Sequence, residues 1–204
     1  QTIPVVVHIV YLPGTPMNTG ENISNLQVIT AIQHLNNAFR KQGAYNGGLY
    51  AVDTEIEFCL AQRDINGLST DGIDRISSTL SNLDMSQDAA LKALTQSPNL
   101  FPSTNYMNIW IVRDICNGAN NCQIAGYSTM AASHGTALDG FVCEANYFGS
   151  STTNSKVAVH EIGHYFNLLH TFQNAGVTCI NNNCLVDGDQ ICDTPPDNSF
   201  FTCN

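Results

Sequence analysis

Four segments of this chain have the apolar pattern of β-strands. Residues 2–12, 50–62, 106–114 and 141–148 are rich in β-branched and aromatic side chains. Apolar and acidic positions alternate in 50–62, which is typical of a strand with one face in solvent. The segment 106–114 is apolar on both faces, so we predict that it lies at the centre of a sheet.

Helical periodicity predicts three helices, over residues 25–41, 86–95 and 156–166. The first should begin at a capping box formed by Ser24 and Gln27 and should stop at Gly43. For the third, the cap is Thr152, Thr153 or Asn154. Strands and helices in this order indicate an α+β fold. Because the sequence has no repeat, low-complexity run or linker, we expect 1–204 to form a single domain.

The predicted third helix carries residues with the spacing of a metal site. His160 and His164 are four positions apart, so both lie on one helix face and can bind one ion. Glu161 is the next residue around the helix and can act on a water molecule near that ion.

A third histidine extends this motif. His170 follows His164 by six positions, a rotation of roughly 600° on a straight helix, which leaves it about 240° from the ligand face. It can join the site only if the helix ends between them, and Asn167 tolerates the left-handed conformation that such an end requires. Three neutral imidazoles bound to Zn²⁺ leave a fourth position for water, as in catalytic zinc sites.

This stretch resembles the zinc signature of the metzincin metallopeptidases, with Asn167 in the glycine position. The sequence HEIGHYFNLLHTF, followed by GDQICDTPP, is similar to the pappalysin branch, and further similar blocks lie at 56–61, 108–110, 125–127 and 139–140. The resemblance implies a metzincin-like catalytic domain, in which helices back a twisted, mixed and mostly parallel sheet. It implies an N-terminal subdomain at 1–167, ending in the active-site helix, and a short, disulfide-rich C-terminal subdomain at 168–204.

The resemblance also implies two features outside the zinc motif. An antiparallel edge strand should border the cleft, and 141–148 is the candidate for it. Metzincins also have a methionine turn beneath the zinc, yet all four methionines of this chain precede His160. We therefore expect the C-terminal subdomain to be truncated.

A calcium site in the C-terminal part is a further implication of the resemblance. Asp189 and Thr194, with the main-chain carbonyls of Gly188 and Cys192, are its implied ligands, and Ca²⁺ prefers such oxygen ligands. The alternative is an acidic, solvated loop held by disulfides.

Composition restricts the partners and the compartment. The formal net charge is −10, with seven Lys plus Arg, so a nucleic-acid partner is not expected, and no apolar run is long enough to span a membrane. The eight cysteines include no C-x-x-C pair, so we expect disulfides and a secreted protein. We predict a Cys116–Cys122 disulfide and consider a second between Cys59 and Cys143.

These observations predict a secreted, zinc-dependent endopeptidase that acts on protein or peptide substrates. A metal-activated water would attack the peptide bond, with Glu161 as general base. Two alternatives remain open: a zinc-retaining but inactive protein-binding module, and a disulfide-stapled structural domain with an accidental motif. The sequence specifies neither the cleavage site nor the oligomeric state.

Overall fold

The centre of the molecule is a six-stranded mixed sheet. A computed structural model describes residues 1–47, 51–94, 100–118, 121–173 and 183–194 of the chain. The strand order is β2-β1-β5-β8-β7, and β3 also pairs with β1. Strand β7 is antiparallel to β8, whereas the other pairs in this sheet are parallel. The strands are β1 (Thr2–Tyr11), β2 (Glu57–Leu60), β3 (Ile73–Ser77), β5 (Met107–Val112), β7 (Gly126–Ser128) and β8 (Phe141–Glu144).

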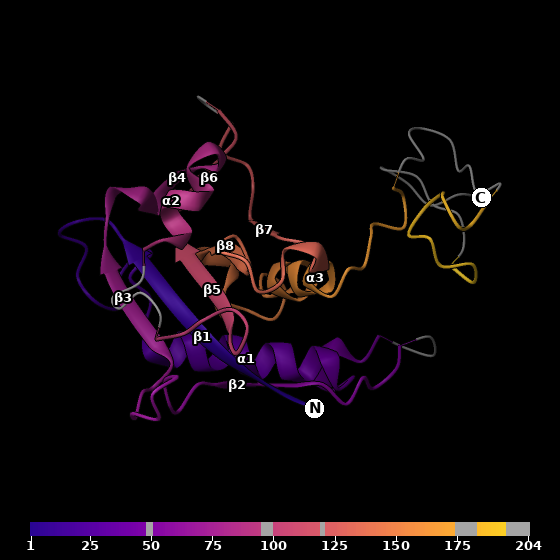
Figure 1. Cartoon of the computed structure of the whole chain (residues 1–204), viewed down its shortest axis with the longest axis horizontal. Helices are drawn as coiled ribbons and strands as arrows, with labels where there is room; N and C mark the ends of the chain where they lie inside the picture. The colour runs from indigo at the N-terminus through magenta and orange to yellow at the C-terminus, as the bar shows by residue number, and fades with distance from the viewer. Residues whose placement is uncertain (48–50, 95–99, 119–120, 174–182, 195–204) are drawn as a thin grey trace.

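Different elements cover the two faces of this sheet (Figure 1). Helices α1 (Asn25–Phe39) and α3 (Lys156–Tyr165) pack on one face. The other face carries α2 (Asp88–Lys92) and a two-stranded sheet of β4 (Asn82–Asp84) and β6 (Asp114–Cys116). Short 3₁₀ turns lie at Gly43–Tyr45, Thr79–Ser81, Met85–Gln87, Ala131–Ser133 and Ala145–Tyr147.

Strand β5 has the central position predicted for it. All six of its residues are buried, with Ile109 and Ile111 in the core beneath α1 and α3, and Trp110 in the core beneath α2. Side chains of a strand alternate between faces, so a strand covered on both sides is apolar throughout. The predicted α+β fold with a mixed, mostly parallel sheet is therefore confirmed.

Two predicted strands are shorter than expected. Within 50–62 only Glu57–Leu60 is a strand, because the described residues before it bind elsewhere: Thr54 donates its N–H to Phe39 O, and Glu55 has a φ of 57°. Within 141–148, the strand Phe141–Glu144 is followed by a 3₁₀ turn. Strand β3 was not among the predicted elements.

The helices also differ from prediction at their ends. Helix α1 ends at Phe39. The first residue after it with a positive φ is Lys41, and not Gly43, which was the predicted stop. Helix α2 occupies only Asp88–Lys92 of the predicted 86–95. Helix α3 lies within the predicted 156–166, but its N-cap is Ser155 rather than Thr152, Thr153 or Asn154.

The side chain of Gln27 links α1 to the segment that follows β8. The predicted cap is present in part, since Ser24 Oγ accepts the Gln27 N–H at 3.0 Å. The Gln27 side-chain amide donates to the carbonyls of Ala145 (3.0 Å) and Phe148 (2.8 Å). These bonds fix the chain just before α3 begins.

Ser155 joins the start of α3 to α1. Its hydroxyl accepts the Gly149 N–H at 3.2 Å and lies 2.8 Å from His34 Nδ1. Gly149 has a φ of 75°, and a Cβ there would lie 2.1 Å from Gln27 O. The close approach of α1 to this loop therefore requires glycine.

The cysteines confirm one disulfide prediction and contradict another. Cys116 and Cys122 are bonded, as are Cys184 and Cys192. Cys59 and Cys143 are free, so the pairing considered for them is wrong. They lie on β2 and β8, which β1 and β5 separate, and three strand spacings of about 4.8 Å each exceed the reach of a disulfide. Cys179 and Cys203 lie outside the described residues.

Across the part of the chain that the structure describes, no helix has both the length and the apolar character needed to cross a bilayer.

We expect Gly149→Ala to destabilise the protein far more than Gly14→Ala. Both residues have positive φ, but a Cβ at Gly14 would meet nothing within 4 Å, whereas at Gly149 it would meet the α1 backbone. Gly14→Ala is the control and should lower the free energy of unfolding by about 1 kcal/mol, from backbone strain alone. Gly149→Ala should lower it by several times more. Urea denaturation measures both values, and equal losses would contradict the proposed close contact.

Candidate metal centre

Helix α3 presents two of the three histidines. Its buried residues Ala158 and Ile162 pack on the sheet, and His160 and His164 lie one turn apart on another face. The His160 and His164 ring centroids are 4.6 Å apart, with the ring planes nearly perpendicular at 86°.

Asn167 ends the helix as the sequence predicts. Its φ is 72°, in the left-handed region. The Asn167 N–H donates to His164 O at 2.7 Å, and the Leu168 N–H donates to Gly163 O at 2.9 Å. This is the Schellman pair of bonds, which satisfies the last helical carbonyls and reverses the chain direction.

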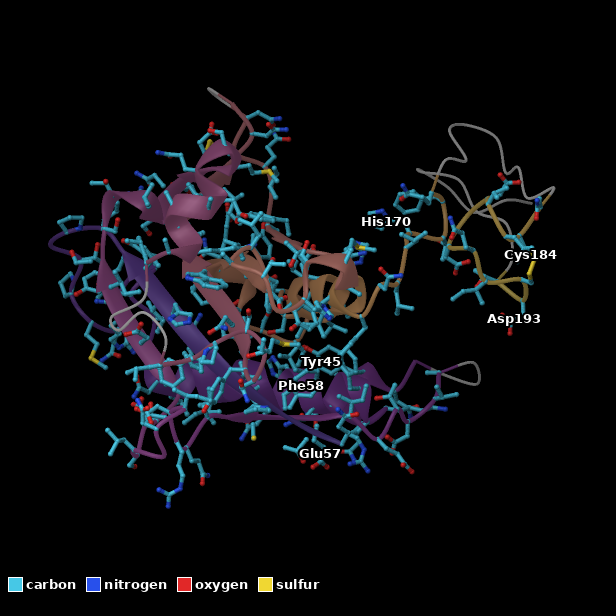
Figure 2. The ribbon with its side chains drawn as sticks, viewed as in Figure 1. Tyr45, Glu57, Phe58, His170, Cys184 and Asp193 are labelled. Atoms are coloured by element: carbon cyan, nitrogen blue, oxygen red, sulfur yellow. A yellow bond between two sulfur atoms is a disulfide. The ribbon has the colours of Figure 1, made fainter. Side chains whose placement is uncertain are left out.

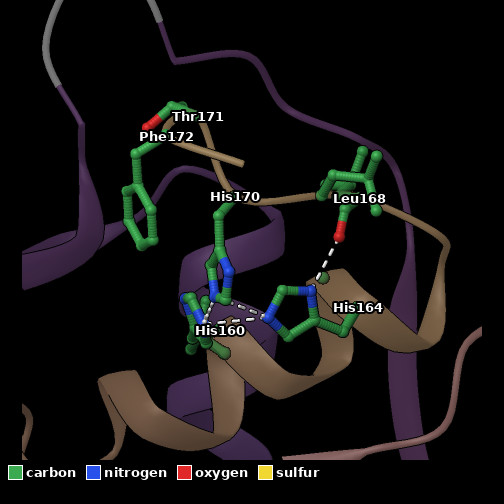
Figure 3. A pocket seen from close by; sticks show the side chains of 9 residues that line it. His160, His164, Leu168, His170, Thr171 and Phe172 are labelled. Atoms are coloured by element: carbon green, nitrogen blue, oxygen red, sulfur yellow. Dashed lines mark hydrogen bonds between the residues drawn. The ribbon is translucent and has the colours of Figure 1, made fainter. Parts of the chain in front are cut away.

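The reversal brings His170 to the other two imidazoles (Figure 3). The three Nε2 atoms are 3.0 Å apart for His164–His160 and His164–His170, and 3.1 Å apart for His160–His170. Among the described residues, this is the one group of three or more His, Cys, Asp or Glu side chains with the proximity that metal binding needs.

The donor atoms fit a zinc ion. Nδ1 of His164 is 2.7 Å from Leu168 O and donates to it, so Nε2 of that ring carries a lone pair. Tetrahedral ligands at Zn–N distances of about 2.0–2.1 Å lie about 3.3 Å apart, close to the observed separations. A cation at the centre of the three rings would be bound by one Nε2 lone pair from each neutral imidazole.

His170 comes from a loop and has its own support. Phe172 stacks on its ring, with centroids 4.7 Å apart and planes 9° from parallel. The Gln173 side chain forms a hydrogen bond to it. Burial lowers the pKa of both His160 and His170, and the neighbouring His164 imidazole lowers it further, which favours the neutral imidazoles that a metal requires.

Glu161 lies beside the histidines and is mostly buried. Its exposed fraction is 8%, and burial raises the pKa of its carboxyl group, partly opposed by the charge of His164 and by a main-chain hydrogen bond from Ser128. Glu161 and His160 line one end of a pocket of about 520 Å³ between α3 and β7. A second pocket, of about 420 Å³, is lined by all three histidines together with Leu168 and Phe172.

The expected edge strand was assigned to the wrong segment. Strand β8, within the predicted 141–148, is internal to the sheet and parallel to β5. The antiparallel edge strand is β7, which packs against α3. Three residues are too few to show strand periodicity, so the only signal in the sequence was the similar block at 125–127.

The other histidines have structural contacts. His8 is buried between Asp74 and Asn108, and His34 contacts Ser155. His134 packs against Tyr165, with ring centroids 4.2 Å apart and the ring planes tilted by 31°.

The residues implied for calcium lie in the described segment 183–194, beyond α3 and away from the sheet, where Cys184 and Asp193 mark it (Figure 2). Asp189 Oδ1 accepts the Ile191 N–H at 3.0 Å, and Cys192 is bonded to Cys184. No described group of three acidic side chains converges there, so a site would depend on main-chain carbonyls.

Comparisons with known proteins agree with this geometry. Mature mirolysin of Tannerella forsythia, in complex with a cleaved peptide, is 31% identical with a TM-score of 0.75, covering 96% of this chain and 71% of that one. A second mirolysin structure, in complex with a compound, is 32% identical with a TM-score of 0.73 and the same coverage. The fold is therefore that of the metzincin metallopeptidases.

The family follows from the sequence match. The model of peptidase family M43, described as pregnancy-associated plasma protein-A, matches residues 95–203, just over half of the chain. An extracellular metalloprotease of Colletotrichum graminicola is 34% identical over 100 residues, which is 46% of this chain and 31% of that protein. The chain belongs to the pappalysin-like family M43, and it spans less than a third of that fungal relative.

We expect Asn167→Gly and Asn167→Val to differ sharply in zinc affinity. Glycine adopts positive φ freely, whereas a β-branched residue there costs about 1–3 kcal/mol and favours a helix that continues past His164. Competition with a chelator should give near-normal affinity for Asn167→Gly and at least about tenfold weaker binding for Asn167→Val. Equal affinities would show that the left-handed exit does not control the site.

Proposed function

We propose that this chain is the catalytic domain of a secreted zinc endopeptidase that hydrolyses peptide bonds in protein or peptide substrates. The observation that carries the proposal is the convergence of three imidazole Nε2 atoms within 3.1 Å, next to a buried glutamate. Membership of a metallopeptidase family supports it.

His160, His164 and His170 would bind the zinc ion, leaving one position open. Zinc at such a site supplies a Lewis acid and lowers the pKa of water to about 7. The protein holds its ligands through the hydrogen bond from His164 to Leu168 and the stacking of Phe172 on His170.

Glu161 would act as the general base. It would take a proton from the attacking water and transfer it to the leaving amine. Burial raises the pKa of its carboxyl group, and a base is more effective when its pKa approaches the working pH. Glu161 directly follows His160 in the sequence and lines the same pocket, so its carboxylate would lie close to the reacting atoms.

The outer edge of β7 would bind the substrate as an added strand. β7 ends the sheet and pairs only with β8 among the described strands, which leaves its second edge for an extended peptide. The pocket of about 520 Å³ lies directly beside this strand. A peptide on β7 would therefore pass Glu161 and His160.

Secretion is part of this proposal. Disulfides such as Cys116–Cys122 and Cys184–Cys192 are typical of proteins in oxidising compartments. The fungal relative is named as an extracellular metalloprotease.

The test is Glu161→Gln in the zinc-loaded protein. The variant should retain one zinc per chain but lose peptide hydrolysis by about 10²–10⁴-fold, because the amide cannot accept the proton. Glu57→Gln is the control, since Glu57 is exposed on β2.

Elemental analysis and a peptide-cleavage assay measure the two quantities, and a chelator should abolish cleavage by the wild type. Full activity of zinc-loaded Glu161→Gln would remove Glu161 from the mechanism. Peptide binding without any cleavage by the wild type would instead select the inactive binding module.

We also propose a structural calcium ion in the segment 183–194, bound by Asp189, Thr194 and the carbonyls of Gly188 and Cys192. Positive φ values at Gly188 (60°) and Gln190 (63°) and the Cys184–Cys192 disulfide support a tight loop there. This part of the proposal rests on the family resemblance.

Calcium should raise the melting temperature of the wild type and slow its proteolysis, but should do neither in Asp189→Ala. Asp193→Ala is the matched control, because Asp193 lies in the same segment but outside the implied ligand set. Thermal unfolding with calcium or with a calcium chelator measures the effect. Indifference of the wild type to calcium would exclude this site.

A further inference from the structure

Strand β7 approaches α3 unusually closely at Gly126. The strand pairs with β8 through Gly126–Cys143, Tyr127–Val142 and Ser128–Phe141. A Cβ built on Gly126 would lie 3.1 Å from Val142 O, 3.1 Å from Val157 Cγ1 and 3.3 Å from Glu161 Cγ. Each distance is shorter than ordinary van der Waals contact, so a side chain here would have to displace one of these groups.

The backbone at Gly126 does not itself require glycine. Its φ lies outside the left-handed region, and as a strand residue it has a conformation that any amino acid adopts. The requirement is therefore one of space. Two of the three groups that fill this space belong to α3, and one of these is the side chain of Glu161.

The same strand holds Glu161 at a second point. The main chain of Ser128 forms a hydrogen bond to the Glu161 carboxylate, while the Ser128 hydroxyl donates to Thr129 O at 3.1 Å. The Glu161 methylene groups thus lie over Gly126 and its carboxylate is held near Ser128. Neither contact involves a side chain of β7.

We propose that Gly126 is a positioning residue for Glu161: the absence of a side chain at 126 lets the glutamate lie flat against β7 with its carboxylate beside the three histidines. This inference rests on the proposed role of Glu161 as general base. It gives β7 a part in positioning the base, since the strand makes room for the Glu161 side chain at Gly126 and holds its carboxylate through the Ser128 main chain.

Gly126→Ala tests this role. The added methyl group points toward α3, so the edge that would bind substrate is unchanged and KM should change by less than about threefold. The neighbours would have to move by only a few tenths of an ångström. Because a displacement of about 1 Å at a reacting group can lower the rate by about 10²-fold, the smaller shift should lower kcat by roughly tenfold. Zinc stoichiometry should stay at one per chain, because none of the three atoms nearest to a Cβ at 126 belongs to a histidine. Gly67→Ala, at an exposed turn where a Cβ would meet nothing within 4 Å, should leave kcat unchanged.

A double-mutant cycle separates positioning from a general structural effect. If Gly126 acts through Glu161, adding Gly126→Ala to Glu161→Gln should change the residual rate by less than about threefold. The same loss of kcat in both backgrounds would overturn the proposal. Adding Val157→Ala to Gly126→Ala gives a less crowded variant should the single change fold poorly. The added methyl group can then occupy the space of the Val157 side chain, so kcat should recover at least in part. An unchanged kcat in this double variant would show that crowding at 126 is not the cause of the loss.

A crystal structure of zinc-loaded Gly126→Ala tests the geometry independently of activity. The expected result is a displaced Glu161 carboxylate with the three imidazoles in place. An unmoved Glu161 would overturn the inference even if the enzyme is active. Absence of chelator-sensitive cleavage by the wild type would refute the proposed function alone, since the position of Glu161 would still be measured.

Discussion

Two histidines on one helix and a third six residues later can bind one ion only if the helix ends between them. On a continuous helix His170 would lie about 240° away from the face of His160 and His164. Asn167 removes this conflict with a φ of 72°, and the bonds from Asn167 to His164 and from Leu168 to Gly163 hold the reversed chain. The 3.0–3.1 Å separations of the three Nε2 atoms depend on this one residue conformation.

The rest of the fold fixes the helix that carries this reversal. Ala158 and Ile162 are buried against the sheet, and Ser155 connects the start of α3 to His34 on α1. Strand β7 of the same sheet also contacts this helix, with Gly126 leaving room for Glu161. Because these contacts come from regular elements, His160, His164 and Glu161 are held in a fixed arrangement, which a catalytic site needs. His170 comes from a loop and is held by the stacking of Phe172.

Local patterns in the sequence predicted the histidine cluster, the role of Asn167 and the central strand β5, because each depends on periodicity or on one residue's conformational preference. Contacts between distant residues left no such pattern. The contact of Gly126 with Glu161 and that of His34 with Ser155 are examples, and the short β7 was therefore missed as the edge strand. The strand predicted at 50–62 was too long because of another contact between distant residues. The N–H of Thr54 bonds to Phe39 at the end of α1 rather than to a neighbouring strand.

X-ray absorption at the zinc edge tests the central claim most directly. For the zinc-loaded protein, the claim predicts three imidazole nitrogens at about 2.0–2.1 Å and one further light ligand. A spectrum that shows sulfur at about 2.3 Å, or only two imidazoles, would contradict the assignment of His160, His164 and His170 as a single site.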